Sequence, residues 1–142
     1  DWSTMVPLNW PKMSEEEKSK RMKSARQHLG FCVRIYAHQI EHGSYYLHEH
    51  PSQATSWNEP CIQKPMQQEA NILSGIDQYH YGFWIEWEFG WSLARKPTKF
   101  LSNPPCIADQ FGRTCPGKNS HTDHRHAPFF GGRSKTAQIY PT

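Results

Sequence analysis

The sequence predicts an α/β fold with a partial open sheet and an irregular, histidine-rich C-terminal tail. Three observations support this prediction: a long amphipathic helix near the N-terminus, several short β-prone segments behind it, and a final stretch rich in Gly, Pro and His. The alternation of helical and β-prone segments is typical of helices layered on a sheet. We therefore divide a single partial domain, 1–142, into a long helix (14–43), a strand and helix layer (44–111) and an irregular tail (112–142).

The long helix has the clearest sequence signals. Ser14 is followed three residues later by Glu17, which is the spacing of a capping box. Gly43 can end the helix, because glycine readily adopts the left-handed conformation of a C-terminal cap. Apolar positions recur every three or four residues and predict one buried face: Met22, Ala25, Leu29, Cys32, Tyr36 and Ile40.

The strand predictions are shorter and weaker. Tyr45–Leu47 is β-prone and predicts a short buried strand, which Pro51 ends. Further strands are expected within 71–77 and 98–102, a broken helix within 58–68 and a short helix within 104–111. The aromatic segment 83–91 fits either a hairpin arm or a poorly packed insertion. Because three strands and one long helix cannot form a parallel sheet covered on both faces, we expect further strands before Asp1.

Composition limits the class of protein. The chain of 142 residues has 36% hydrophobic residues and 19 aromatic ones, namely 6 Trp, 6 Tyr and 7 Phe, which together can support a modest core. A formal charge of +3 is too small to predict nucleic-acid binding and leaves that partner open. No apolar run approaches the length of a membrane span. We expect the four cysteines to be reduced thiols in an intracellular protein, cytoplasmic or nuclear.

Two polar segments follow the predicted strands. His48, Glu49 and His50 come directly after Tyr45–Leu47, and Asp77 ends the segment 71–77. Ligands of open α/β sheets bind beyond the carboxyl ends of the strands, and a carboxylate there can accept hydrogen bonds or act as acid or base. Both segments are also compatible with solvated turns, and the i, i+2 histidines with metal ligation.

The tail contains a third group of candidate residues. Cys106, Cys115, His121, His124 and His126 could supply three or four ligands to Zn²⁺. Their separations match none of the standard zinc-finger spacings. A histidine-rich surface loop is therefore the alternative to a zinc site, for which Cys115, His121, His124 and His126 are the candidate ligands.

Four segments in combination resemble a methyltransferase-like module of phage-type DNA methylases and retrotransposon-like elements. The resemblance lies in Y-Y-L-H-E-H-P (45–51), A-T-S-W (54–57), D-Q-x-x-Y-G (77–82) and K-P-T-K-F-L-S-N (96–103), with His124, His126 and A-Q-I-Y-P (137–141) closing the chain. It spans nearly the whole chain, although its motifs are loose. It implies the C-terminal half of the class I, S-adenosylmethionine-dependent DNA cytosine methyltransferase fold, which is a Rossmann-like α/β fold.

The resemblance also implies roles for individual residues. Glu49 matches the glutamate that contacts the target base, and the segment around Ser3 resembles the tail of the catalytic loop; His48, His50, Asp77 and Asn103 are the implied substrate-binding residues. The catalytic prolines and the glycine-rich cofactor loop would precede Asp1, and no G-x-G-x-x-G segment occurs. The chain is thus predicted to be a methyltransferase-like fragment that is not catalytic by itself. Segment 83–93 is longer than the pattern, and His80 stands where a cysteine is expected; both departures indicate a diverged copy.

Two other functions stay open. A non-catalytic nucleic-acid-binding module would use the aromatic side chains with Arg95, Lys96, Lys99, Arg113 and Lys118. A small zinc-stapled structural protein would use the cysteines and histidines of the tail. If the chain is a methyltransferase-like fragment, we expect S-adenosylmethionine to be the cofactor of the intact protein from which it comes. Its expected partner is either the missing N-terminal half or a second copy of the chain, paired along an open sheet edge.

Overall fold

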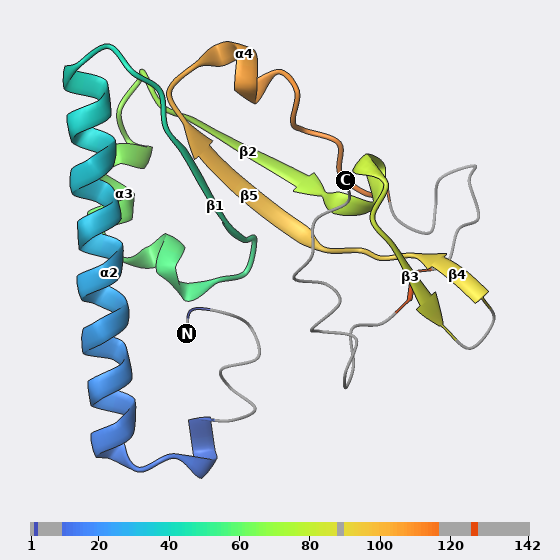
Figure 1. Cartoon of the computed structure of the whole chain (residues 1–142), viewed down its shortest axis with the longest axis horizontal. Coiled ribbons are helices and arrows are strands. Elements are labelled where there is room, and N and C mark those ends of the chain that lie inside the picture. Colours follow the sequence, from blue (N-terminus) through green and yellow to red (C-terminus); the bar gives the residue numbers. More distant parts are fainter. Residues whose placement is uncertain (1, 3–9, 88–89, 117–125, 128–142) are drawn as a thin grey trace.

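The computed structural model describes residues 2, 10–87, 90–116 and 126–127. Within them lie a long helix, a three-stranded sheet, a separate two-stranded hairpin and several short helical turns (Figure 1). In chain order the elements are η1 (Trp10–Lys12), α2 (Glu15–Glu41), β1 (Leu47–Pro51), η2 (Thr55–Asn58), α3 (Pro60–Met66), β2 (Ile72–Asp77), η3 (Gln78–Tyr81), β3 (Trp84–Trp87), β4 (Gly90–Leu93), β5 (Pro97–Ser102) and α4 (Pro105–Ala108).

The main sheet has the strand order β1-β5-β2. The central strand β5 pairs antiparallel with both neighbours: Glu49 and Ser74 each lie opposite Phe100. Since β1 and β2 both run against β5, they are parallel to each other, and their carboxyl ends lie at the same edge of the sheet. β1 and β2 are the outer strands of this sheet, and each has one ladder partner among the described residues.

Helix α2 begins at the predicted capping box. The Ser14 side chain accepts a hydrogen bond from the Glu17 backbone, and the Glu17 side chain accepts one from the Ser14 backbone. Leu29 is buried on the face toward the sheet, and Met22, Ala25, Val33 and Tyr36 pack against the same core. In the last turn, Ile40 is 39% exposed, so the predicted apolar face is only partly buried.

One core fills the space between α2, α3 and the sheet (Figure 1). An ion pair fixes the two helices to each other: Arg26 Nε lies 3.1 Å from Glu59 Oε2, at the start of α3. The buried members of this core come from six separate parts of the chain: Trp2, Leu29, Tyr46, Ala54, Trp57, Ile62 and Leu101.

The hairpin β3-β4 has a small core of its own. Ile85 is 2% and Phe83 4% exposed, and they cluster with Ala94 and Ala127. The Ala127 backbone donates to the Leu93 carbonyl, and Leu93 forms a parallel bridge with His126. Segment 83–91 therefore contains a hairpin, one of the two predicted alternatives.

Two expectations about the sheet need correction. The predicted strand Tyr45–Leu47 begins two residues too early, because β1 is Leu47–Pro51 and residues 48–50 lie within the strand instead of following it. Proline fits there because β1 is an edge strand. The second expectation was a parallel sheet, whereas both ladders of the observed sheet are antiparallel. The described part is thus a mixed α/β structure with a small, open antiparallel sheet.

Other predictions agree with the structure. The second and third strands and the short helix occur where they are expected. The helix that was predicted to be broken is instead continuous as α3, with Pro60 in its first turn and Pro65 inside it. All four cysteines are free thiols. Among the helices of the described residues, none has both the length and the apolar character that crossing a membrane requires.

Candidate functional site

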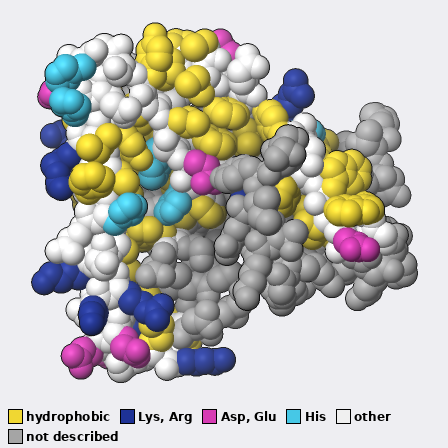
Figure 2. Space-filling model, viewed as in Figure 1, with side chains coloured by type: hydrophobic (Ala, Val, Ile, Leu, Met, Phe, Trp, Pro, Cys, Tyr) yellow, Lys and Arg dark blue, Asp and Glu magenta, His cyan; other side chains and the backbone are white. Residues whose placement is uncertain are grey.

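The candidate site is the edge of the sheet where β1 and β2 end and β5 begins. Pro51 lies opposite Thr98, and Asp77 lies opposite Pro97. Pro51 and Asp77, which are 26 positions apart in the sequence, are thus brought to one edge by β5. In the space-filling view, histidine and acidic side chains lie beside hydrophobic side chains near the end of β1 (Figure 2).

His48 faces the core between the sheet and α2. It is 7% exposed and lies opposite Leu101, with its ring edge-on to Trp57 at 5.2 Å between centroids. His48 Nδ1 shares a hydrogen bond of 2.9 Å with the hydroxyl of Tyr36, and Tyr36 stacks on Tyr46 at 4.5 Å. His48 Nε2 is buried and has no hydrogen-bond partner among the described residues.

His50 points to the same face of β1, because side chains two residues apart in a strand share a face. Its Nδ1 hydrogen-bonds the hydroxyl of Ser56, which is fully buried. Trp57 lies beside it and donates from Nε1 to the Pro51 carbonyl at 2.8 Å. Since the Ser56 hydroxyl is inaccessible, this Ser–His pair holds the loop after β1 in place and is no exposed nucleophile.

Burial determines the protonation of this cluster. Burial, and secondarily the neighbouring His50, lowers the pKa of His48 to about 4. Burial also lowers the pKa of His50 and raises that of Tyr46 to about 12. At neutral pH both imidazoles are therefore uncharged, so the cluster offers neutral hydrogen-bonding groups and no positive charge.

Glu49 lies on the opposite face of the sheet from the two histidines. It is half-buried and is paired with Phe100, whose ring stacks on Phe111 at 4.2 Å. Burial lowers the pKa of the Lys96 ammonium, and the negative charge of Glu49 opposes this change. The three residues predicted as one group therefore lie on two faces of the sheet. His48 and His50 face the core, and the Glu49 carboxylate lies on the opposite face, where a ligand could contact it.

Asp77 is the most buried acidic group of the edge, with its side chain 2% exposed. Its carboxylate accepts a hydrogen bond of 2.6 Å from the Cys115 backbone and one of 3.2 Å from Arg95 Nε. Its backbone N–H donates to the Arg113 carbonyl. Asp77 thus connects the end of β2 to the segment that begins the tail.

Two of the predicted zinc ligands approach each other beside this carboxylate. Cys115 Sγ lies 3.2 Å from His126 Nε2. The ring of Tyr79 packs against those of His126 and His80, at 4.9 and 4.0 Å between centroids. Burial, and then contact with the Cys115 thiol, raises the pKa of Tyr79 to about 12.

The remaining predicted site residues lie elsewhere. Asn103 accepts a hydrogen bond from the Tyr46 backbone and donates one to the Ser44 carbonyl, so both ends of its amide join the end of β5 to the chain before β1. Cys106 is exposed in α4. Ser3, His121 and His124 lie outside the described residues.

The sequence did not indicate the groups that orient the histidines. Tyr36 was assigned only to the buried face of the helix, and the residue pattern predicted no role for Ser56 and Trp57. The resemblance did include Ser56 and Trp57 in the segment A-T-S-W, which was the one available signal that this loop belongs to the site.

Comparisons with known proteins do not identify the chain: no family model, no curated protein and no solved structure matches it.

Proposed function

We propose that this chain is the C-terminal half of a methyltransferase-like domain that acts on a nucleic-acid base and depends on an N-terminal half for its cofactor. One observation carries the proposal: β5 lies between β1 and β2 and runs antiparallel to both. An antiparallel strand between two parallel ones is compatible with the mixed α/β fold that the resemblance implies. A fold alone does not determine a function, so the function must come from the residues at the edge of the sheet.

Those residues fit the recognition of a base. The half-buried Glu49 offers a carboxylate in β1, two residues before the strand ends, and a carboxylate accepts hydrogen bonds from the amino group of a base. A base in a duplex has to be flipped out of the stack to reach such a group. His48, His50 and Ser56 would act indirectly, by holding β1 and the loop after it in position.

The outer edge of β1 supports the proposed dependence on a second half. In the proposed domain a parallel strand would pair along this edge and would place the cofactor beside the end of β1. Glycine-rich phosphate or cofactor loops begin such domains, and no G-x-G-x-x-G segment occurs in this chain. S-adenosylmethionine would therefore be held chiefly by the N-terminal half.

Methyl transfer by a longer polypeptide that joins this chain to a cofactor-binding half tests the role of Glu49. We expect Glu49→Gln to lower the rate by about 10²-fold or more, since a positioned acid–base or hydrogen-bonding group contributes on the order of 10²–10⁴. Glu86→Gln is the matched control, because Glu86 is exposed on β3. An unchanged rate in Glu49→Gln would remove the role that we assign to Glu49.

A second candidate function, nucleic-acid binding without catalysis, is favoured by the hairpin. Trp84 is 50% and Trp91 70% exposed, and their partners across the hairpin are Leu93 and Glu86. The register puts both tryptophans on one face, where bases can stack. Binding of single-stranded DNA that weakens with added salt and is lost in Trp91→Ala would support this function. An affinity that neither added salt nor Trp91→Ala changes would contradict it.

The third candidate, a zinc-stapled tail, rests on the distance between Cys115 and His126. Bonds of ~2.3 Å to sulfur and ~2.0 Å to nitrogen put two tetrahedral zinc ligands about 3.5 Å apart, close to the observed separation. The other proposed ligands, His121 and His124, would complete the site. Chelator treatment should then lower the melting temperature, and an unchanged melting temperature would exclude a structural zinc.

A further inference from the structure

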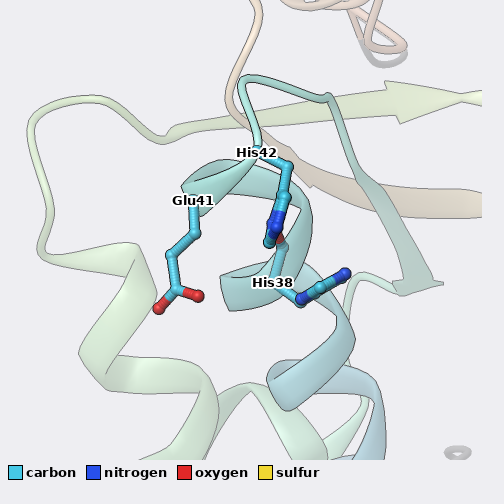
Figure 3. Close-up of side chains that lie close together, drawn as sticks. All are labelled: His38, Glu41 and His42. Atoms are coloured by element: carbon cyan, nitrogen blue, oxygen red, sulfur yellow. The ribbon is translucent and has the colours of Figure 1, made fainter.

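The last turn of α2 and its C-cap residue carry a group of potential metal ligands apart from the candidate site. His38, Glu41 and His42 each offer a ligand atom, and these atoms lie within 4.8 Å of one another. Figure 3 shows the two imidazole rings close together at the end of the helix, with the Glu41 carboxylate directed to one side of them. The ring centroids of His38 and His42 are 4.1 Å apart. All three residues are exposed, so their side chains can rotate to close around an ion.

We propose that His38, Glu41 and His42 form a surface site for Zn²⁺. Residues three and four positions apart lie on one face of a helix, which brings the three ligands to the same side. Two histidines and a glutamate are a ligand set that zinc uses when its fourth position is left to water. This site does not depend on the methyltransferase proposal, because it lies at the end of α2, before the segment that connects this helix to β1.

The orientation of His42 supports this site. Its Nδ1 lies 2.8 Å from the carbonyl oxygen of His38. A carbonyl can only accept a hydrogen bond, so Nδ1 carries the proton, and the lone pair of the neutral ring is on Nε2. Metal-binding histidines are commonly oriented in this way, by donating from the other ring nitrogen to a backbone carbonyl.

The helix itself also favours a cation here. The aligned peptide dipoles of a helix leave a partial negative charge at its C-terminal end, which stabilises a positive ion near the last turn. The chain then turns at Gly43, which has φ +67°, and continues into β1. A bound ion would therefore hold the end of α2 beside the turn that leads to the candidate site.

The same residues also read as H-x-x-E-H, a spacing found in zinc peptidases whose glutamate activates water. Such catalysis needs a cleft that excludes bulk water and positions the substrate. Here all three side chains are exposed at a helix end, so the chemistry supports ion binding and no peptidase activity.

Titration calorimetry with ZnCl₂ tests the proposal. The Cys115→Ser variant serves as the parent, because it removes the cysteine of the other proposed zinc site. We expect one saturable zinc site per chain, and affinity lowered at least about tenfold in His38→Gln and in His42→Gln, since disturbing even the support of a ligand costs about 10–100-fold. Glu41→Gln should also weaken binding. Melting temperatures without metal should stay unchanged, because the three side chains are exposed.

Two matched controls and a direct readout complete the experiment. His28→Gln removes an exposed histidine of the same helix that contacts Cys32, and Glu16→Gln removes an exposed glutamate of the first turn; both should keep full affinity. In NMR spectra, zinc should shift the ring resonances of His38 and His42. Absence of saturable binding to the parent, unchanged affinity in His42→Gln, or an equal loss in His28→Gln would each overturn the proposal.

Discussion

Among single residues, His48 has the most unusual environment. Its imidazole is buried between Tyr36 and Trp57, and its pKa is lowered to about 4 from an ordinary value of 6.5. Between these two pH values the unfolded chain binds a proton that the folded chain does not. The free energy of unfolding therefore falls as the pH falls from 6.5 to 4, and the contribution of His48 is fully present only above this range.

Replacing His48 tests this dependence. The side chain of His48→Gln cannot titrate, although it can still accept a hydrogen bond from Tyr36. We expect the variant to lose less stability than the wild type between pH 7 and pH 4.5, by at most about 3 kcal/mol, since one pKa unit corresponds to ~1.4 kcal/mol. Urea unfolding at pH 7 and pH 4.5 measures this loss of stability, and His28→Gln, at an exposed histidine, is the control. Equal pH dependence of variant and wild type would show that His48 does not titrate as described.

Residue by residue, the sequence could indicate which groups are polar but not which way they face. His48 and His50 occupy inward positions that aliphatic residues usually fill in an edge strand, so the alternation of β1 was hidden. Their partners Tyr36 and Ser56 come from α2 and η2, and only the folded chain brings them together. Glu49 was predicted as a site residue, and its place on the other face follows from the register with Phe100.

Among the elements, α2 was the most predictable, because the capping box and the apolar face are local signals. The strands 72–77 and 97–102 could be predicted from β-prone residues alone. Their order could not, since β5 crosses back between two earlier strands through contacts distant in sequence. The pairing of Cys115 with His126 depends in the same way on the hairpin β3-β4, to which His126 is bridged.

The connection between β2 and the segment 113–115 depends on Asp77. Replacing it by alanine leaves the Cys115 N–H without its acceptor and breaks the ion pair with Arg95. We expect Asp77→Ala to lower the free energy of unfolding by about 1–3 kcal/mol, the cost of an unsatisfied buried donor. Urea unfolding measures the loss. Asp109→Ala, at an exposed aspartate after α4, should change stability by at most about 0.5 kcal/mol; a similarly small change in Asp77→Ala would contradict the role of this contact.

For the whole molecule, the outer edge of β1 has no ladder partner among the described residues. Tyr45 and Leu47 are 63% and 43% exposed beside it. An outer strand without a covering element invites pairing with another chain. We expect the purified chain to self-associate as its concentration rises in size-exclusion chromatography, and Leu47→Lys to shift it toward the monomer. The exposed Leu73 of β2 gives the matched control Leu73→Lys.

A wild-type chain that stays monomeric at high concentration would contradict this prediction. It would indicate that residues of the chain itself cover β1, and that the sheet needs no further strand. The same result would weaken the half-domain interpretation, because that interpretation requires an edge at which the N-terminal half can pair.

The central claim is that this chain supplies half of a cofactor-dependent methyltransferase-like domain. Calorimetric titration with S-adenosylmethionine tests it most directly, on the chain alone and on the chain joined to a half that carries the glycine-rich cofactor loop. We predict no saturable heat for the chain alone and saturable binding for the joined polypeptide. Saturable binding by the chain alone, or none by the joined polypeptide, would contradict the account.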